Sequence, residues 1–77
     1  MIKALLFAQL KETVGKPELE IDGEGKSVKE VRTFLKDRYE LLSIDRAMVA
    51  VNEEYANDTT ILNEGDVIAF IPPVSGG

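Results

Sequence analysis

The side chains that most often do chemistry in proteins are missing from this sequence. Its 77 residues include no cysteine and no histidine, which removes the thiol nucleophile, the thiolate metal ligand and the usual general base. We interpret its acidic side chains, such as Glu53 and Glu54, as solvated surface, because a glycosidase-type acid pair needs a pocket that so small a chain does not provide. We therefore expect no metal site here. The remaining candidate for chemistry is the α-carboxylate of Gly77.

The last six residues, Pro72-Pro73-Val74-Ser75-Gly76-Gly77, suit the presentation of that carboxylate. Two consecutive glycines end a chain by chance in roughly 0.5% of cases. The proline pair stiffens the stem, and six extended residues reach roughly 19 Å. Because glycine has no Cβ, a partner's active site can close tightly around it. We expect residues 72–77 to be an extended tail that reacts inside a partner, with a frayed chain end as the alternative.

A second motif, Gly23-Glu24-Gly25-Lys26-Ser27, ends like a phosphate-binding loop. The complete motif has a glycine five residues before Gly25, where this chain has Glu20. A carboxylate at that position would repel phosphate. We interpret the segment as a glycine turn that leads into a capped helix.

Charge and hydropathy exclude two classes of partner. A net charge of −5 argues against nucleic acid, which binds clustered basic surfaces. The longest apolar runs have five residues, far short of the 18 or more of a membrane span, and the N-terminus does not resemble a secretory signal. We expect a single domain over residues 1–77, located in the cytoplasm.

The elements that must carry the tail follow from apolar periodicity and turn signals. Residues 1–9 are apolar and predict a strand. Pro17–Asp22 alternates and predicts a half-exposed strand antiparallel to the first. Ser27-Val28-Lys29-Glu30 is a capping box, and helical spacing of apolar residues continues from there to about Tyr39.

The second half of the chain is predicted to be mainly strands. Ala47–Asn52 is a nearly continuous apolar run, typical of a strand that is covered on both faces or central in its sheet. A short strand is expected near Thr60–Leu62, and Val67–Ile71 is the last strand. This order predicts an α+β fold in which one main helix packs on one face of a small mixed sheet.

Alternation along the first and last strands leaves apolar side chains on both faces. If Leu6 and Phe70 meet the helix, then Leu5, Phe7 and Ile71 lie on the opposite side, where exposed apolar residues would mark a partner surface. Parity alone does not decide which face is buried. Simple core packing of these residues is therefore the alternative.

Three segments, "MIKALLFAQLKETVG", "AVN" and "LNEGDVIAFIPPVSGG", together resemble the MoaD/ThiS family of sulfur carriers, in particular the small subunit of molybdopterin synthase. The resemblance covers the whole chain, and only the pattern matches between Lys16 and Arg46. It implies the ubiquitin-like β-grasp fold.

The resemblance also implies a mechanism. A ubiquitin-activating-type adenylyltransferase, using ATP and Mg, would adenylate Gly77, and a sulfur donor would displace AMP to leave a thiocarboxylate. Pro73, Val74, Ser75 and Gly76 would insert into the active site of the large subunit. There the sulfur would attack cyclic pyranopterin monophosphate, and two such transfers would build the dithiolene of molybdopterin. This chain would bind no cofactor of its own.

The resemblance places Phe7 and Ile71 at the interface with the large synthase subunit, in a heterotetramer of two small and two large subunits. Leu5 is included in the expected interface because strand alternation puts it on the same face as Phe7. Ile71 stands where the family often has an aromatic residue. The chain would be a non-catalytic, sulfur-donating subunit, active only with the large one.

Three alternatives share parts of this interpretation. A ubiquitin-like modifier would use the same activation step but would be conjugated to lysines through Gly77. A carrier for thiamine or another sulfur pathway would also form a thiocarboxylate. A plain binding module would keep its function without Gly76 and Gly77.

Overall fold

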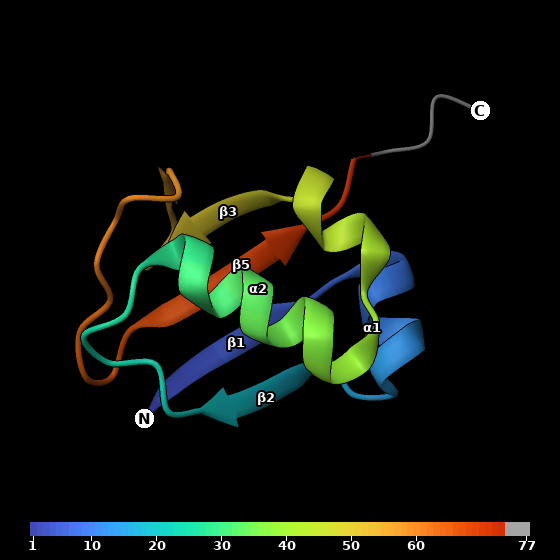
Figure 1. Ribbon diagram of the computed structural model, residues 1–77, viewed down its shortest axis with the longest axis horizontal. Helices are drawn as coiled ribbons and strands as arrows, with labels where there is room; N and C mark the ends of the chain where they lie inside the picture. Colours follow the sequence, from blue (N-terminus) through green and yellow to red (C-terminus); the bar gives the residue numbers. More distant parts are fainter. Residues whose placement is uncertain (74–77) are drawn as a thin grey trace.

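The computed structural model describes residues 1–73, where a main helix crosses one face of a five-stranded sheet (Figure 1). Residues 74–77 lie outside the described range. The elements are, in chain order, β1 (Ile2–Leu6), α1 (Ala8–Val14), β2 (Glu18–Ile21), α2 (Val28–Tyr39), the 3-10 helix η1 (Leu42–Arg46), β3 (Met48–Val51), β4 (Glu54–Ala56) and β5 (Val67–Ile71).

The sheet has the strand order β2-β1-β5-β3-β4. The central strands β1 and β5 run parallel, whereas β1 with β2, β3 with β4 and β3 with β5 are antiparallel. Strands β2 and β4 are therefore the two edges. The predicted α+β fold with a small mixed sheet is confirmed.

The core lies between the sheet and α2. The side chains of Leu6, Ile68 and Phe70 are at most 2% exposed, and β1 alternates between buried and more exposed positions along its length. The remaining buried hydrophobic residues are Ile2, Ala4, Leu10, Val28, Val31, Leu35, Leu41, Ile44, Ala47, Val49 and Leu62. The helix thus covers the face that holds Leu6 and Phe70 and leaves the other face of the sheet free.

Helix α2 begins at the predicted capping box. The Glu30 amide donates to Ser27 Oγ and the Ser27 amide donates to Glu30 Oε1, each at 3.1 Å. Both bonds satisfy amide groups that a helix start leaves without intrahelical partners. The predicted end at Tyr39 is also confirmed.

The first predicted strand was too long. It ends at Leu6, and α1 follows from Ala8. Leu10 is the buried residue of α1, and an apolar side chain four residues later, at Val14, also packs against the core, as helical spacing requires. Gly15 ends the helix at φ 86°, with its N–H donated to the Lys11 carbonyl.

One expectation for the second half is confirmed in one of its two forms, and another is wrong. β3 is internal, between β5 and β4, which agrees with a strand inside the sheet. Its faces are not both covered, because Met48 is 52% exposed while Val49 is buried. No strand forms at Thr60–Leu62, where Ile61 makes only an isolated bridge to Ser27. The extra strand is β4 instead, because a tight turn after Val51 folds the chain back on β3.

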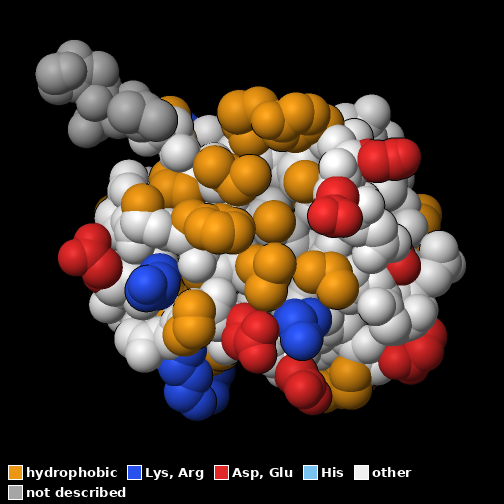
Figure 2. Space-filling view, turned by 180° about the vertical axis from the view of Figure 1, so that it is seen from behind, with side chains coloured by type: hydrophobic (Ala, Val, Ile, Leu, Met, Phe, Trp, Pro, Cys, Tyr) orange, Lys and Arg blue, Asp and Glu red, His pale blue; other side chains and the backbone are white. Residues whose placement is uncertain are grey.

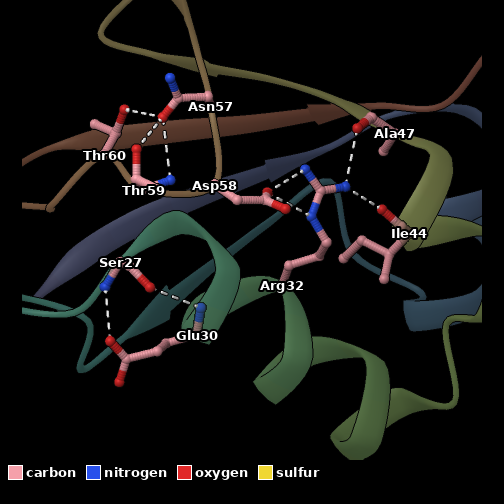
Figure 3. A network of polar contacts seen from close by, with 9 residues as sticks. All are labelled: Ser27, Glu30, Arg32, Ile44, Ala47, Asn57, Asp58, Thr59 and Thr60. Carbon is pink, nitrogen blue, oxygen red and sulfur yellow. Dashed lines mark hydrogen bonds and ion pairs between the residues drawn. The ribbon is translucent and has the colours of Figure 1, made fainter.

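Arg32 fastens α2 to the segments around it (Figure 3). Its guanidinium donates to the carbonyl oxygens of Ile44 and Ala47 at 2.5 and 2.9 Å, and to the Asp58 carboxylate at 3.0 Å. The side chain is only 13% exposed and lies 5.9 Å from the ring centroid of Phe70. One side chain therefore joins the helix, the middle and C-terminal end of η1 and the loop before β5.

Candidate functional site

The candidate site is the face of the sheet that α2 leaves open, which we call the outer face. Strand register places one row of side chains across it, because Leu5 pairs with Ala69, Ala69 with Ala50, and Ala50 with Tyr55. Directly paired residues of neighbouring strands point to the same side of a sheet. Apolar side chains gather at the centre of this side of the molecule, with charged ones around them (Figure 2).

A hollow of about 690 Å³ lies in the outer face. Two small side chains, Ala50 and Ala69, lie in the row between the larger Leu5 and Tyr55. The alanines form the floor, and the larger side chains form the walls. A concave apolar surface with a narrow floor suits a projecting apolar side chain of another protein.

Phe7 and Ile71 line the end of the hollow nearest the tail. They remain 45% and 37% exposed, although large apolar side chains are usually buried. Ile71 is the last residue of β5, Pro72 after it is buried, and Pro73 is exposed. The hollow therefore lies beside the point where the chain leaves the sheet.

The turn between β3 and β4 lines the opposite end of the hollow. Val51 pairs with Glu54, so the turn has two residues, Asn52 and Glu53, both with positive φ (51° and 71°). Such turns match the twist of a hairpin but favour glycine at the second position. The Glu53 backbone is therefore strained, and its carboxylate adds a negative charge at this end of the hollow.

Asn52 also anchors this end to β5. Its side chain donates to Asp66 Oδ1 and accepts from the Val67 amide, both at 3.0 Å. Asp66 accepts a further bond from the Asn63 amide at 2.8 Å. These bonds, first that from the Asn63 amide and then that from Asn52, lower the pKa of Asp66 below its ordinary value.

The structure brings together three of the residues singled out from the sequence. Leu5, Phe7 and Ile71 all line the hollow, so the expected outer apolar patch is present. Pro73 is exposed directly after β5. The expected tail residues Val74, Ser75 and Gly76 and the reacting Gly77 lie outside the described residues.

Sequence reasoning missed Tyr55, which is 75% exposed and lines the hollow. Its place depends on the two-residue turn at Asn52-Glu53, which pairs Ala50 with Tyr55. A residue preference for such turns could have indicated a hairpin here, but Glu53 is not the usual glycine. Without the hairpin, the parity of Tyr55 cannot be assigned.

Residues 1–73 contain no group of three acidic side chains placed to hold a metal ion. In the same range no helix has the length and apolar character needed to cross a membrane.

The chain matches known proteins over its full length. A sulfur carrier subunit of molybdopterin synthase from Escherichia coli K12 is 37% identical, with all of both chains covered. Another protein of that name, from Dictyostelium discoideum, is 44% identical over 97% of this chain and 94% of its own.

Solved structures agree on the fold. A putative molybdopterin converting factor subunit 1 from Pyrococcus furiosus superposes with a TM-score of 0.81 at 30% identity, covering 95% of this chain and 97% of its own. The small archaeal modifier protein 1 of Methanosarcina acetivorans superposes with a TM-score of 0.82 at 30% identity, covering 99% of this chain and 95% of its own. A complex of subunits 1 and 2 of the molybdopterin-converting factor from Helicobacter pylori contains a chain that superposes with a TM-score of 0.71 at 27% identity. The match covers 99% of this chain and 97% of that one.

The family model described as the ThiS family matches residues 4–77, which include the outer-face residues as well as the double glycine. Together with the full-length relatives, this match shows that the chain belongs to the ThiS family of ubiquitin-like β-grasp proteins.

Proposed function

We propose that this chain is the sulfur-carrying small subunit of a molybdopterin synthase. The observation that carries the proposal is the position of the hollow. Its exposed Phe7 and Ile71 adjoin the stem at Pro72-Pro73, so a partner that covers the outer face meets the start of the tail. The names of the full-length relatives support the same function.

The proposed chemistry takes place at the α-carboxylate of Gly77. A carboxylate is a poor electrophile, so an activating enzyme first transfers AMP from ATP to one carboxylate oxygen and releases pyrophosphate. A sulfur donor then attacks the acyl carbon and AMP leaves, which gives a thiocarboxylate. These two reaction steps need no cysteine or histidine side chain from the carrier, in agreement with the absence of both residue types from the chain.

In the synthase, the thiocarboxylate sulfur forms a bond to an oxygen-bearing side-chain carbon of cyclic pyranopterin monophosphate, and the carbon–oxygen bond at that carbon breaks, so that the oxygen stays with the phosphate or leaves as water. Water then cleaves the bond between the acyl carbon and sulfur, and the Gly77 carboxylate is regenerated. Two carriers supply the two sulfurs of the dithiolene. We propose a heterotetramer with two large subunits, each covering one outer face and receiving Pro73, Val74, Ser75 and Gly76.

Deletion of Gly76 and Gly77 tests this function in a reconstituted system with the activating enzyme, a sulfur donor and the large subunit. The two glycines follow the last strand, so we expect the truncated chain to melt at the same temperature as the full chain. Adenylation and molybdopterin formation should both be lost. Molybdopterin synthesis by the truncated carrier would refute the proposal.

A second candidate function is favoured by the likeness to the small archaeal modifier protein 1. A modifier would also be adenylated at Gly77 but would end in an isopeptide bond to a lysine. Mass spectrometry of the protein from its native cells separates the two functions. A thiocarboxylate at Gly77 supports the carrier, and branched Gly-Gly–lysine peptides support the modifier.

A further inference from the structure

Strand β2 forms an edge of the sheet whose outer backbone groups face away from β1. The Leu6 amide donates to the Pro17 carbonyl at 2.8 Å, and β1 and β2 are antiparallel with Leu5 opposite Glu18. Because hydrogen-bonded pairs alternate along antiparallel strands, the N–H and C=O groups of Glu18 and Glu20 point outward. No other strand of residues 1–73 pairs with this edge.

An apolar groove of about 520 Å³ runs between the end of β2 and α2. Ile21, Val31 and Phe34 contribute its apolar lining. Phe34 is 50% exposed, whereas its neighbour Leu35 is fully buried in the core. A half-exposed aromatic ring beside an unpaired strand edge is a combination that fits a bound chain in the extended conformation.

The side chains of β2 divide by charge between the two sides of the strand. Leu19 and Ile21 are half-buried on the side of α2, and Glu18 and Glu20 are exposed on the other. Glu18 forms an ion pair with Lys3, with 3.8 Å between Glu18 Oε2 and Lys3 Nζ. Glu20 has no ion pair within residues 1–73.

The charged residues that line the groove itself, Lys26 and Lys29 with Asp22 and Glu30, balance to zero. Charge selection therefore comes from the two carboxylates of β2. A second copy of β2 added to this edge would place carboxylates near carboxylates, which is unfavourable. Copies of this chain are therefore poor occupants, and basic side chains are good ones.

We propose that β2 binds an extended segment of a partner protein by strand addition, and that this segment alternates apolar and basic residues. Its backbone pairs with Glu18 and Glu20, its apolar side chains enter the groove toward Phe34, and its lysines or arginines lie opposite the two carboxylates. This surface includes neither the hollow nor the tail, so the proposal does not depend on sulfur transfer.

The test is an NMR titration of the isotope-labelled chain with an acetylated, amidated peptide of four Val-Lys repeats. A peptide of four Val-Glu repeats has the same apolar content and the opposite charge, and is the control. We expect the Val-Lys peptide to shift the amide signals of residues 18–21 and of residues near Phe34. The Val-Glu peptide should bind at least about tenfold more weakly.

Two substitutions at exposed positions separate the contribution of the groove from that of charge, whereas the amide shifts of residues 18–21 report on the backbone pairing. Phe34→Ser should weaken Val-Lys binding about three- to tenfold by removing the aromatic wall of the groove, and Glu20→Lys should weaken it by a similar factor through charge. Thermal melts check that both variants are folded. Equal binding of the two peptides, unchanged affinity in both variants, or no shifts along residues 18–21 would each overturn the proposal.

Discussion

Phe7 is the residue whose environment decides the interpretation of the outer face. It follows β1 by one residue and points to the face that α2 does not cover, so almost half of its surface stays exposed. Ile71 is exposed at the end of β5 for the same reason. Burial of both side chains in a complex would contribute several kcal/mol of hydrophobic free energy, at roughly 25 cal/mol per Å² of apolar surface.

Substitution Phe7→Glu distinguishes an interface residue from a core residue. Because Phe7 is exposed, the variant should keep its free energy of unfolding within about 1 kcal/mol. Affinity for the large synthase subunit should fall by at least about thirtyfold, since a charge would be buried at an apolar contact. Calorimetric titration measures the affinity and urea denaturation the stability.

Leu42→Glu is the matched control, because Leu42 is 77% exposed in η1 and does not line the hollow. It should leave both quantities unchanged. An unfolded Phe7→Glu variant would mean that Phe7 is a core residue, and a folded variant with normal affinity would exclude it from the interface.

Among the elements, the alternating strands and the capped helix could be predicted from sequence, because each has a local pattern with a physical cause. The capping box at Ser27 and the parity of Leu5 and Phe7 are examples. Helix α1 could not be separated from β1 in this way, since "ALLFAQL" is apolar enough for either state. Burial of Leu10 against the core is a tertiary effect, and it decides in favour of the helix.

The hairpin between β3 and β4 was missed because its turn contains an unfavourable residue. Glu53 has φ 71°, which costs a residue with a Cβ roughly 1–2 kcal/mol. Glu53→Gly would remove this strain, but glycine also gains more conformational entropy in the unfolded state, which offsets part of the gain. The net effect should be a stabilisation of the chain by about 0.5–1 kcal/mol. Glu54→Gly, in β4, is the control and should destabilise the chain instead. Urea denaturation measures the free energy of unfolding of both variants. A Glu53→Gly variant less stable than the unchanged chain would contradict this account of the turn.

Arg32 connects helix α2 to η1 and to the loop before β5, so its removal should lower the stability of the whole domain. Arg32→Ala leaves the carbonyl groups of Ile44 and Ala47 without their charged donor and should cost about 2 kcal/mol in the free energy of unfolding. Arg32→Lys should recover only part of this loss, because an ammonium group cannot copy the guanidinium fork. Arg38→Ala, at an exposed helix position, is the control. It should change the free energy of unfolding by less than about 0.5 kcal/mol. Equal stability of Arg32→Ala and Arg38→Ala would show that the contacts of Arg32 contribute nothing to the stability of the domain.

In the proposed function, the parts of the whole molecule have separate roles. Helix α2 and the core support the sheet, the hollow in the outer face is the proposed contact for a partner, and β5 leads from that hollow into Pro72-Pro73. The composition of the tail could be read directly from the sequence. The shape of the hollow could not, because it depends on two alanines and a tyrosine that neighbouring strands bring into one row.

The central claim is that the α-carboxylate of Gly77 is the reacting group, and the addition of a single alanine after Gly77 tests it most directly. Every existing side chain stays in place, but the carboxylate moves one residue beyond the position at which the partner's active site closes. We predict that the extended chain keeps most of its affinity for the large subunit through the outer face, while adenylation and thiocarboxylate formation are nearly abolished. Mass spectrometry of the intact protein measures the replacement of oxygen by sulfur and also reveals any trimming of the added residue. An untrimmed, alanine-extended chain that gains sulfur at the normal rate would contradict the claim.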